Sequence, residues 1–167
     1  MDSSINSDNT FLGHPKGLFV LFFTEMWERF SFYGMRAILV LYIYSSVENN
    51  GLGWSERDAI WLYGWYTMFV YVMSIPGGLI ADRLLGAKKS VMLGGILLCV
   101  GHWIMAIPNI TAFFMALAII VMGVGLLKPN ISTMVGGLYK ELDARRERGF
   151  TIFYIGINIG ALAASFV

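Results

Sequence analysis

Four charged residues fall inside one apolar stretch near the start of the chain, in the segment TEMWERFSFYGMRAILVLYIY. An α-helix turns about 100° per residue, so Arg29 and Arg36 would lie about 40° and about 20° from Glu25. On the same wheel Glu28 lies at about −60° and Tyr33 at about 80°. The charged side chains therefore share one helix face. Carboxylates and guanidinium groups gathered in this way can carry protons and bind anions.

This charged face is unsuited to contact with lipid. Each charge costs roughly 2.5 to 3.5 kcal/mol near the centre of a membrane helix, so the face must line a polar cavity or a bundle interior. Glu25 and Arg29 have i,i+4 spacing and can form an ion pair, which leaves a purely structural network as one interpretation. Arg36 lies about two turns beyond Arg29 with no acidic neighbour in the helix. A substrate carboxylate would satisfy its guanidinium group.

A second isolated charge, Lys128, occurs in the apolar segment VMGVGLLKPN. It could pair structurally with an acidic residue of the first helix. Alternatively, the same pair could couple proton uptake to substrate binding, because the proton affinity of a carboxylate depends on whether its neighbour is the lysine or the substrate. Pro129 removes a backbone donor and predicts a kink. Tyr66 and Tyr71 could offer hydroxyl groups to a ligand, or could simply pack.

The elements that position these residues are predicted to be membrane helices. The chain has 167 residues, of which 57% are hydrophobic and 14% charged, so its solvent must include lipid. A span needs about 20 mostly apolar residues. We expect an all-α integral membrane protein with a polar cytoplasmic tail over residues 1–15, followed by part of a six-helix bundle over residues 16–167. Five spans are predicted, at about 17–46, 59–81, 90–107, 112–139 and 150–167.

The connections between the spans predict an orientation, because Lys and Arg are retained on the cytoplasmic side. The second-to-third and fourth-to-fifth connections are rich in basic residues, and the two connections that alternate with them are poor in them. The N-terminus is therefore expected in the cytoplasm, in a multi-pass protein of the plasma or inner membrane. The basic residues of the two cytoplasmic connections are Arg83, Lys88, Lys89, Lys140, Arg145, Arg146 and Arg148.

Several smaller features are given structural interpretations. His14 is expected to be a solvated residue of the tail, and Cys99 a small buried hydrophobe. His102 is expected in the core or at an interface. The break between the third and fourth spans is predicted at Pro108 and Asn109. Six glycines are predicted to be sites of close helix packing, namely Gly77, Gly78, Gly123, Gly125, Gly156 and Gly160.

Other classes of function are disfavoured by what the sequence contains. The sequence has no HExxH motif, no Cys/His cluster and no evident nucleophile with a base, so neither an enzyme nor a metal centre is expected. A net charge of +1 provides no field for nucleic acid. The last span ends at Val167 without a basic flank, which predicts that the sequence is part of a longer protein.

The residues quoted above carry a resemblance to a known family. The segment Glu25 to Gly34, EMWERFSFYG, resembles the ExxERFxYYG motif of the proton-dependent oligopeptide transporters, a branch of the major facilitator superfamily. GGLIADRLLGAK, GVGLLKPN and FYIGINIG resemble further signatures. The resemblance extends from about Gly13 to Val167. It implies a carrier of twelve or more helices that moves di- and tripeptides inward with protons by alternating access, driven by the proton gradient and without a cofactor.

The resemblance also implies residue roles. Glu25, Glu28, Arg29 and Lys128 would form a proton-coupling network. Arg36 and Lys128 would face the carboxylate end of a peptide, with Tyr33, Tyr66 and Tyr71 on the binding wall; Asn158 occupies a signature position with a structural or binding role. Phe32 replaces the first of the two tyrosines of the motif, so one hydroxyl group is lost. The amine of a zwitterionic peptide needs a carboxylate, which is expected in the missing C-terminal helical bundle.

Two alternatives stay open. A nitrate or other small-anion transporter of the same family would use similar cations, although the complete ExxER triple favours peptide transport with protons. A truncated, non-transporting membrane subunit would fit the short length.

Overall fold

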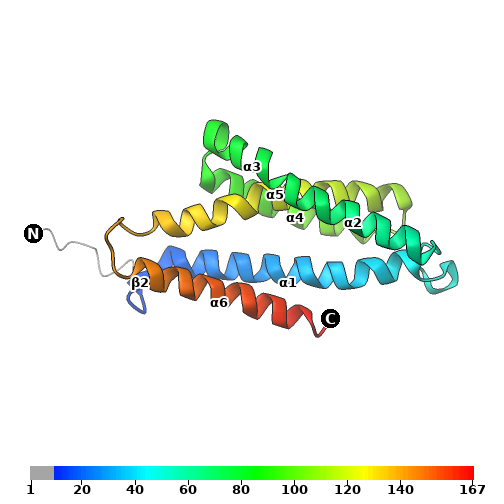
Figure 1. The fold of residues 1–167 in the computed structure, drawn as a ribbon, viewed down its shortest axis with the longest axis horizontal. Helices are drawn as coiled ribbons and strands as arrows, with labels where there is room; N and C mark the ends of the chain where they lie inside the picture. Colours follow the sequence, from blue (N-terminus) through cyan, green and yellow to red (C-terminus); the bar gives the residue numbers. More distant parts are fainter. Residues whose placement is uncertain (1–9) are drawn as a thin grey trace, which may run out of the picture. The chain divides into compact units, whose positions relative to one another are not determined.

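The computed structural model describes residues 10–167, which are mostly helical (Figure 1). A short hairpin pairs β1, Thr10–Phe11, with β2, His14–Pro15, in antiparallel register. The helices are α1 (Lys16–Tyr44), α2 (Glu56–Val72), α3 (Ser74–Ile80), α4 (Ala87–Met105), α5 (Ile110–Gly137) and α6 (Arg146–Ala164), with a 3₁₀ turn at Val47–Asn49 and a π-helical segment at Ala81–Leu85. These helices occupy the five predicted segments, with ends displaced by no more than about one turn.

Local sequence explains where the helices begin. The Ser55 side chain accepts a hydrogen bond from the Asp58 amide at 3.1 Å and caps α2. The Asn109 side chain accepts bonds from the amides of Thr111 and Ala112 at 2.8 and 3.2 Å, so it caps α5. The predicted break at Pro108 and Asn109 is thereby confirmed, since α4 ends at Met105.

The second predicted segment is one helical stretch with an interruption. Pro76 has no amide hydrogen and cannot donate to the carbonyl of Val72, which is the last residue of α2. Helical hydrogen bonds resume on both sides, since the Met73 amide donates to Phe69 and the Gly77 amide donates to Met73. The chain therefore continues as a helix through Met73 into α3.

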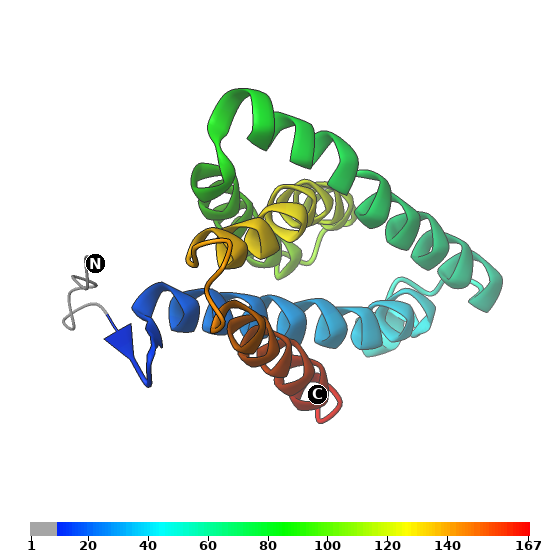
Figure 2. The ribbon, with the colours of Figure 1, turned by 60° about the vertical axis from the view of Figure 1, so that its left-hand side comes forward.

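The described residues divide into two compact units, and each is described by itself. Unit 1 contains residues 10–34 with Thr133–Val167, and unit 2 contains Met35–Ser132. In unit 1, α6 lies beside the first part of α1 (Figures 1 and 2). A methyl group added at Gly156 would overlap Phe22, and one added at Gly160 would overlap the Met26 carbonyl. These two glycines therefore let the helices approach closely, as predicted.

The hairpin of unit 1 is anchored to the connection between α5 and α6. His14 is only 8% exposed, and its Nδ1 lies 2.8 Å from the Tyr139 hydroxyl. Arg145 donates to the Gly13 carbonyl at 3.0 Å and pairs with Asp143 at 2.7 Å. The prediction that His14 is solvated is therefore wrong. Residues 1–9 of the predicted tail lie outside the described residues.

Unit 2 is also held by close glycine contacts. Gly77 faces the backbone of Gly125, and Gly94 faces Gly123 and Leu127, leaving no room for a side chain at either position. The predicted packing role is confirmed for Gly77, Gly123 and Gly125, as it is for Gly156 and Gly160 in unit 1. At Gly78 an added methyl group would make only an ordinary contact, 3.9 Å from Pro129.

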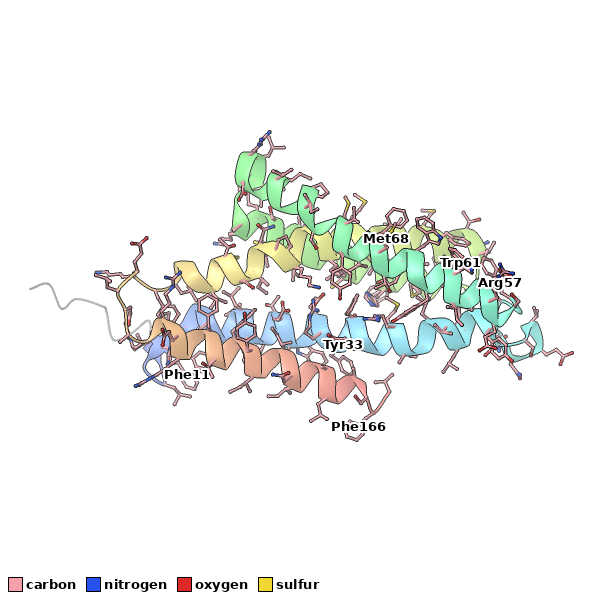
Figure 3. All side chains as sticks on the ribbon, viewed as in Figure 1. Phe11, Tyr33, Arg57, Trp61, Met68 and Phe166 are labelled. Atoms are coloured by element: carbon pink, nitrogen blue, oxygen red, sulfur yellow. The ribbon has the colours of Figure 1, made fainter. Side chains whose placement is uncertain are left out.

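Many large apolar side chains point outward. The helical stretches Glu56–Leu85 and Ile110–Gly137 are long and apolar enough to cross a membrane by length and composition. Trp61 and Met68, labelled along α2 in Figure 3, are 57% and 42% exposed. Cys99 is exposed too, so the prediction that it is buried is wrong. Exposed apolar surface of this extent is expected where lipid is the solvent.

Candidate functional site

Unit 1 contains a buried cluster of three charged side chains on α1. Glu25, Glu28 and Arg29 are 4%, 5% and 5% exposed. The Arg29 Nε donates to Glu25 Oε1 at 3.1 Å and also to Glu28 Oε2. The Arg29 guanidinium carbon lies 5.4 Å from the centre of the Phe32 ring, a cation–π contact. The structure thus brings together Glu25, Glu28 and Arg29, which helical spacing places on one face of α1.

Helix α6 helps to position this cluster. Because Gly160 has no side chain, the Met26 carbonyl and the Arg29 Cβ can lie against it. One terminal nitrogen of Arg29, Nη2, is buried without a hydrogen-bond partner among the described residues. A buried donor of this kind is costly unless satisfied, so an anionic oxygen would be stabilised there.

Two further predicted site residues lie in unit 1. Tyr33, labelled on α1 in Figure 3, is 39% exposed, and its neighbour Phe32 is only 4% exposed. Asn158 lies on the exposed surface of α6, where its amide donates to the Tyr154 carbonyl of the same helix at 3.0 Å. Both polar side chains are accessible to a ligand.

Unit 2 contains Arg36, which is held by a tyrosine of α2. The Arg36 Nε donates to the Tyr63 hydroxyl at 2.7 Å, and its Nη2 contacts the same oxygen. The Arg36 guanidinium carbon lies 5.0 Å from the centre of the Tyr63 ring. Tyr63 is absent from the predicted site residues, because the sequence does not show which residue of another helix Arg36 meets. The contact joins residues 27 positions apart and depends on helix packing.

Lys128 lies in the same unit, on α5. Its ammonium nitrogen is 4.4 Å from the centre of the Tyr71 ring, so the tyrosine face stabilises the cation. Tyr71 is 55% exposed, whereas Tyr66 is only 3% exposed. Of the two tyrosines predicted on α2, Tyr71 therefore contacts a cation and Tyr66 is a buried residue.

The predicted site residues are divided between the units. Unit 1 holds Glu25, Glu28, Arg29, Tyr33 and Asn158, and unit 2 holds Arg36, Tyr66, Tyr71 and Lys128. Within residues 10–167, no three His, Cys, Asp or Glu side chains are grouped so that they could hold a metal ion. The chemistry available is therefore that of buried carboxylates, half-buried cations and tyrosine hydroxyl groups.

Comparison with known proteins identifies the family. The sequence model of the POT family matches residues 88–167. A di-/tripeptide transporter of Lactococcus lactis is 49% identical over 170 residues, which cover 100% of this chain and 34% of that protein. The chain belongs to the POT family. An uncharacterised transporter of Bacillus subtilis is also 49% identical to this POT chain, over 158 residues that cover 94% of it and 32% of the relative.

Solved structures agree with this membership. A crystal structure of the peptide transporter POT in complex with sulfate has a TM-score of 0.92 and 53% identity, covering 95% of this chain and 32% of that one. A POT family transporter in complex with 5-aminolevulinic acid has a TM-score of 0.89 and 46% identity, covering 93% of this chain and 32% of that one. The POT chain is thus an all-α integral membrane protein with the N-terminal helices of a major facilitator superfamily fold, in a family of transporters and not of enzymes.

The POT chain spans about a third of the length of the relatives that it matches. The described helices therefore account for only part of the machinery that those proteins contain.

Proposed function

We propose that this chain is part of a symporter that carries di- and tripeptides across the cytoplasmic membrane together with protons. The proposal rests on the relatives named as di-/tripeptide transporters and on the chemistry of the charged residues. Transport proceeds by alternating access and draws its energy from the proton gradient, without a cofactor.

The observation that carries the proposal is that a tyrosine of α2 contacts each of the two predicted site cations of unit 2, Arg36 and Lys128. The Arg36 guanidinium group donates to the Tyr63 hydroxyl, and Lys128 lies over the ring of Tyr71. Both cations are half-buried. Tyrosine orients a cation without neutralising its charge, and guanidinium and ammonium groups bind carboxylates. The carboxylate end of a peptide supplies that anion, and Tyr33, Tyr66, Tyr71 and Asn158 complete the binding residues proposed for this chain.

Proton coupling is assigned to Glu25, Glu28, Arg29 and Lys128. Arg29 is shared between two carboxylates, so protonation of either one removes a charged partner and leaves the guanidinium group able to hold a substrate anion. Deprotonation restores the ion pair and favours release of that anion. This exchange links the presence of a proton to the presence of substrate.

The group that binds the amine of the peptide is proposed to lie outside these 167 residues. A zwitterionic peptide has an amine, and a carboxylate to pair with it is proposed in a C-terminal helical bundle. The 167-residue chain alone is then expected to show no peptide uptake in proteoliposomes. The N-terminus is proposed to lie in the cytoplasm, because the connections around Lys88 and Arg146 are the basic ones.

The decisive experiment measures uptake of labelled dipeptide into proteoliposomes that contain the protein expressed from its complete reading frame. Uptake is expected to require an inward proton gradient, and to fall to background in Glu28→Gln and Lys128→Ala. Lys140→Ala is the matched control, because Lys140 is an exposed lysine in the connection between α5 and α6. It should retain full uptake.

Three outcomes would contradict the proposal. Uptake that ignores the gradient would remove the proton coupling, and uptake of nitrate without dipeptides would assign the protein to the small-anion transporters of the family. Absence of any uptake by the complete protein would favour a non-transporting membrane subunit.

A further inference from the structure

Two prolines interrupt neighbouring helical stretches of unit 2. Pro129 lies inside α5 and cannot donate to the Gly125 carbonyl, just as Pro76 in α3 cannot donate to Val72. The two interruptions face each other. A methyl group added at Gly125 would come within 2.7 Å of Met73, at the junction of α2 and α3, and one added at Gly77 would overlap the Gly125 carbonyl.

Asn130 provides a polar link between these two interruptions. It follows Pro129 directly and is 4% exposed. Its side-chain amide donates to the Leu126 carbonyl at 2.7 Å, and makes a second, longer contact of 3.5 Å with the Gly77 carbonyl of α3. The first bond reinforces the turn of α5 that Pro129 weakens. The second attaches that turn to α3.

The turn that Asn130 closes is the one that carries Lys128. Residues 126–130 include Lys128 and Pro129, and Tyr71 lies on the helical stretch that leads through Met73 to Gly77. A bond from Asn130 to Gly77 therefore joins the backbone segment of the lysine to the backbone segment of its aromatic partner. A buried amide must satisfy its donors, so this geometry is retained as long as the side chain can donate.

We propose that Asn130 is a positioning residue that holds the Lys128 ammonium over the Tyr71 ring. Its role in transport rests on the proposed function, in which Lys128 binds the substrate carboxylate. The positioning itself is a property of unit 2 and can be measured without transport.

The first test is the NMR signal of the Lys128 ε-methylene group in the full-length protein labelled with ¹³C-lysine, identified by its loss in Lys128→Arg. The Tyr71 ring should shift this signal upfield. Asn130→Leu removes the donor with little change in size, and should abolish more than about half of that shift because the turn is no longer tied to α3. Asn130→Thr can still donate to the i−4 carbonyl but does not reach Gly77, and should give an intermediate shift.

The matched control is Ser90→Ala, which removes a fully buried polar side chain from α4 in the same unit. It should leave the Lys128 signal unchanged. An unchanged Lys128 signal in both Asn130 variants, with the protein folded, would overturn the proposal. An equal displacement of the Lys128 signal in Ser90→Ala would also overturn the proposal, because the effect would then reflect loosening of the whole unit.

The second test separates binding from turnover. In proteoliposomes, Asn130→Leu should raise the half-saturating dipeptide concentration about five- to tenfold, with the maximal rate changed less than about twofold. A loss of maximal rate with unchanged half-saturation would overturn the link to substrate binding. If the wild-type protein transports no peptide while the Lys128 signal still responds to Asn130, the proposed function fails and the positioning role stands.

Discussion

At the scale of single residues, the structure shows tyrosine contacts to two cations that the sequence pattern did not specify. Arg36 contacts the hydroxyl group and the ring of Tyr63. Lys128 likewise lies over Tyr71. An aromatic partner orients a cation and leaves its positive charge intact. The tyrosines of α2 are therefore as important to the proposed function as the charges that the sequence displays.

The Arg36 contact leads to a prediction for Tyr63. Tyr63→Phe removes the hydroxyl acceptor and keeps the ring, so the Arg36 guanidinium group should become less well oriented. We expect the half-saturating dipeptide concentration to rise about five- to tenfold, as the loss of one hydrogen bond to a charged group would produce. Tyr44→Phe, at an exposed tyrosine of α1, is the control and should behave as wild type. Equal half-saturation in the two variants would show that the hydroxyl of Tyr63 does not contribute.

The contact of Gly160 with α1 leads to a second prediction. A methyl group at this position would overlap the Met26 carbonyl and lie 3.0 Å from the Arg29 Cβ, so backbone must move. Gly160→Ala should destabilise the protein by about 1 to 3 kcal/mol, measured as a lower unfolding temperature in detergent. Gly95→Ala should not do so, because an added methyl group there meets no atom within 4 Å. A similar melting temperature for both variants would contradict the close packing of α6 on α1.

At the scale of elements, the hairpin β1–β2 and the α5–α6 connection form one cluster within unit 1. His14 contacts the Tyr139 hydroxyl, and Arg145 contacts both the Gly13 carbonyl and Asp143. The hydrogen bonds from the Arg145 side chain and amide lower the pKa of Asp143 to about 2. The hairpin is therefore attached to a charged pair, although its residues belong to the segment that the sequence predicted to be a polar tail.

This cluster predicts a pH dependence. Because the pKa of Asp143 is lowered on folding, its pair with Arg145 contributes fully above the ordinary aspartate value near 3.9 and is lost as the pH falls through about 2. The ¹³C signal of the Asp143 carboxyl group should therefore titrate with a midpoint near 2. In Arg145→Ala the midpoint should return toward the ordinary value. An unshifted midpoint in the wild-type protein would mean that the pair does not form in solution.

At the scale of the whole molecule, this POT family chain spans about a third of the length of the relatives that it matches. The orientation proposed for this chain in the membrane rests on a charge rule and is open to direct measurement. Leu142 lies in the basic α5–α6 connection and is 99% exposed, and Glu48 is an exposed residue of the connection between α1 and α2.

These two positions give a prediction for topology. In a Cys99→Ser background, a membrane-impermeant maleimide applied to intact cells should label Glu48→Cys and not Leu142→Cys. Leu142→Cys should react only after the membrane is permeabilised, since the connection that carries Arg145, Arg146 and Arg148 is expected in the cytoplasm. Labelling of Leu142→Cys from outside would reverse the proposed orientation.

The sequence by itself determined the helices, the charged face of α1, most of the glycine contacts and the family. Each of these depends on local patterns: apolar length, a period of about 3.6 residues, or small residues at helix crossings. The grouping of Glu25, Glu28 and Arg29 could be predicted because one turn of helix brings them together.

Only the tertiary structure decided which tyrosine meets which cation, where Asn130 donates, and that His14 is buried. These contacts join residues far apart in the chain, 27 positions for Arg36 with Tyr63 and 125 for His14 with Tyr139. Helical periodicity determines the direction in which a side chain points from the axis of its helix. The residue that the side chain meets depends on how the helices pack. In this chain the close approach permitted by glycine at the helix crossings sets that packing.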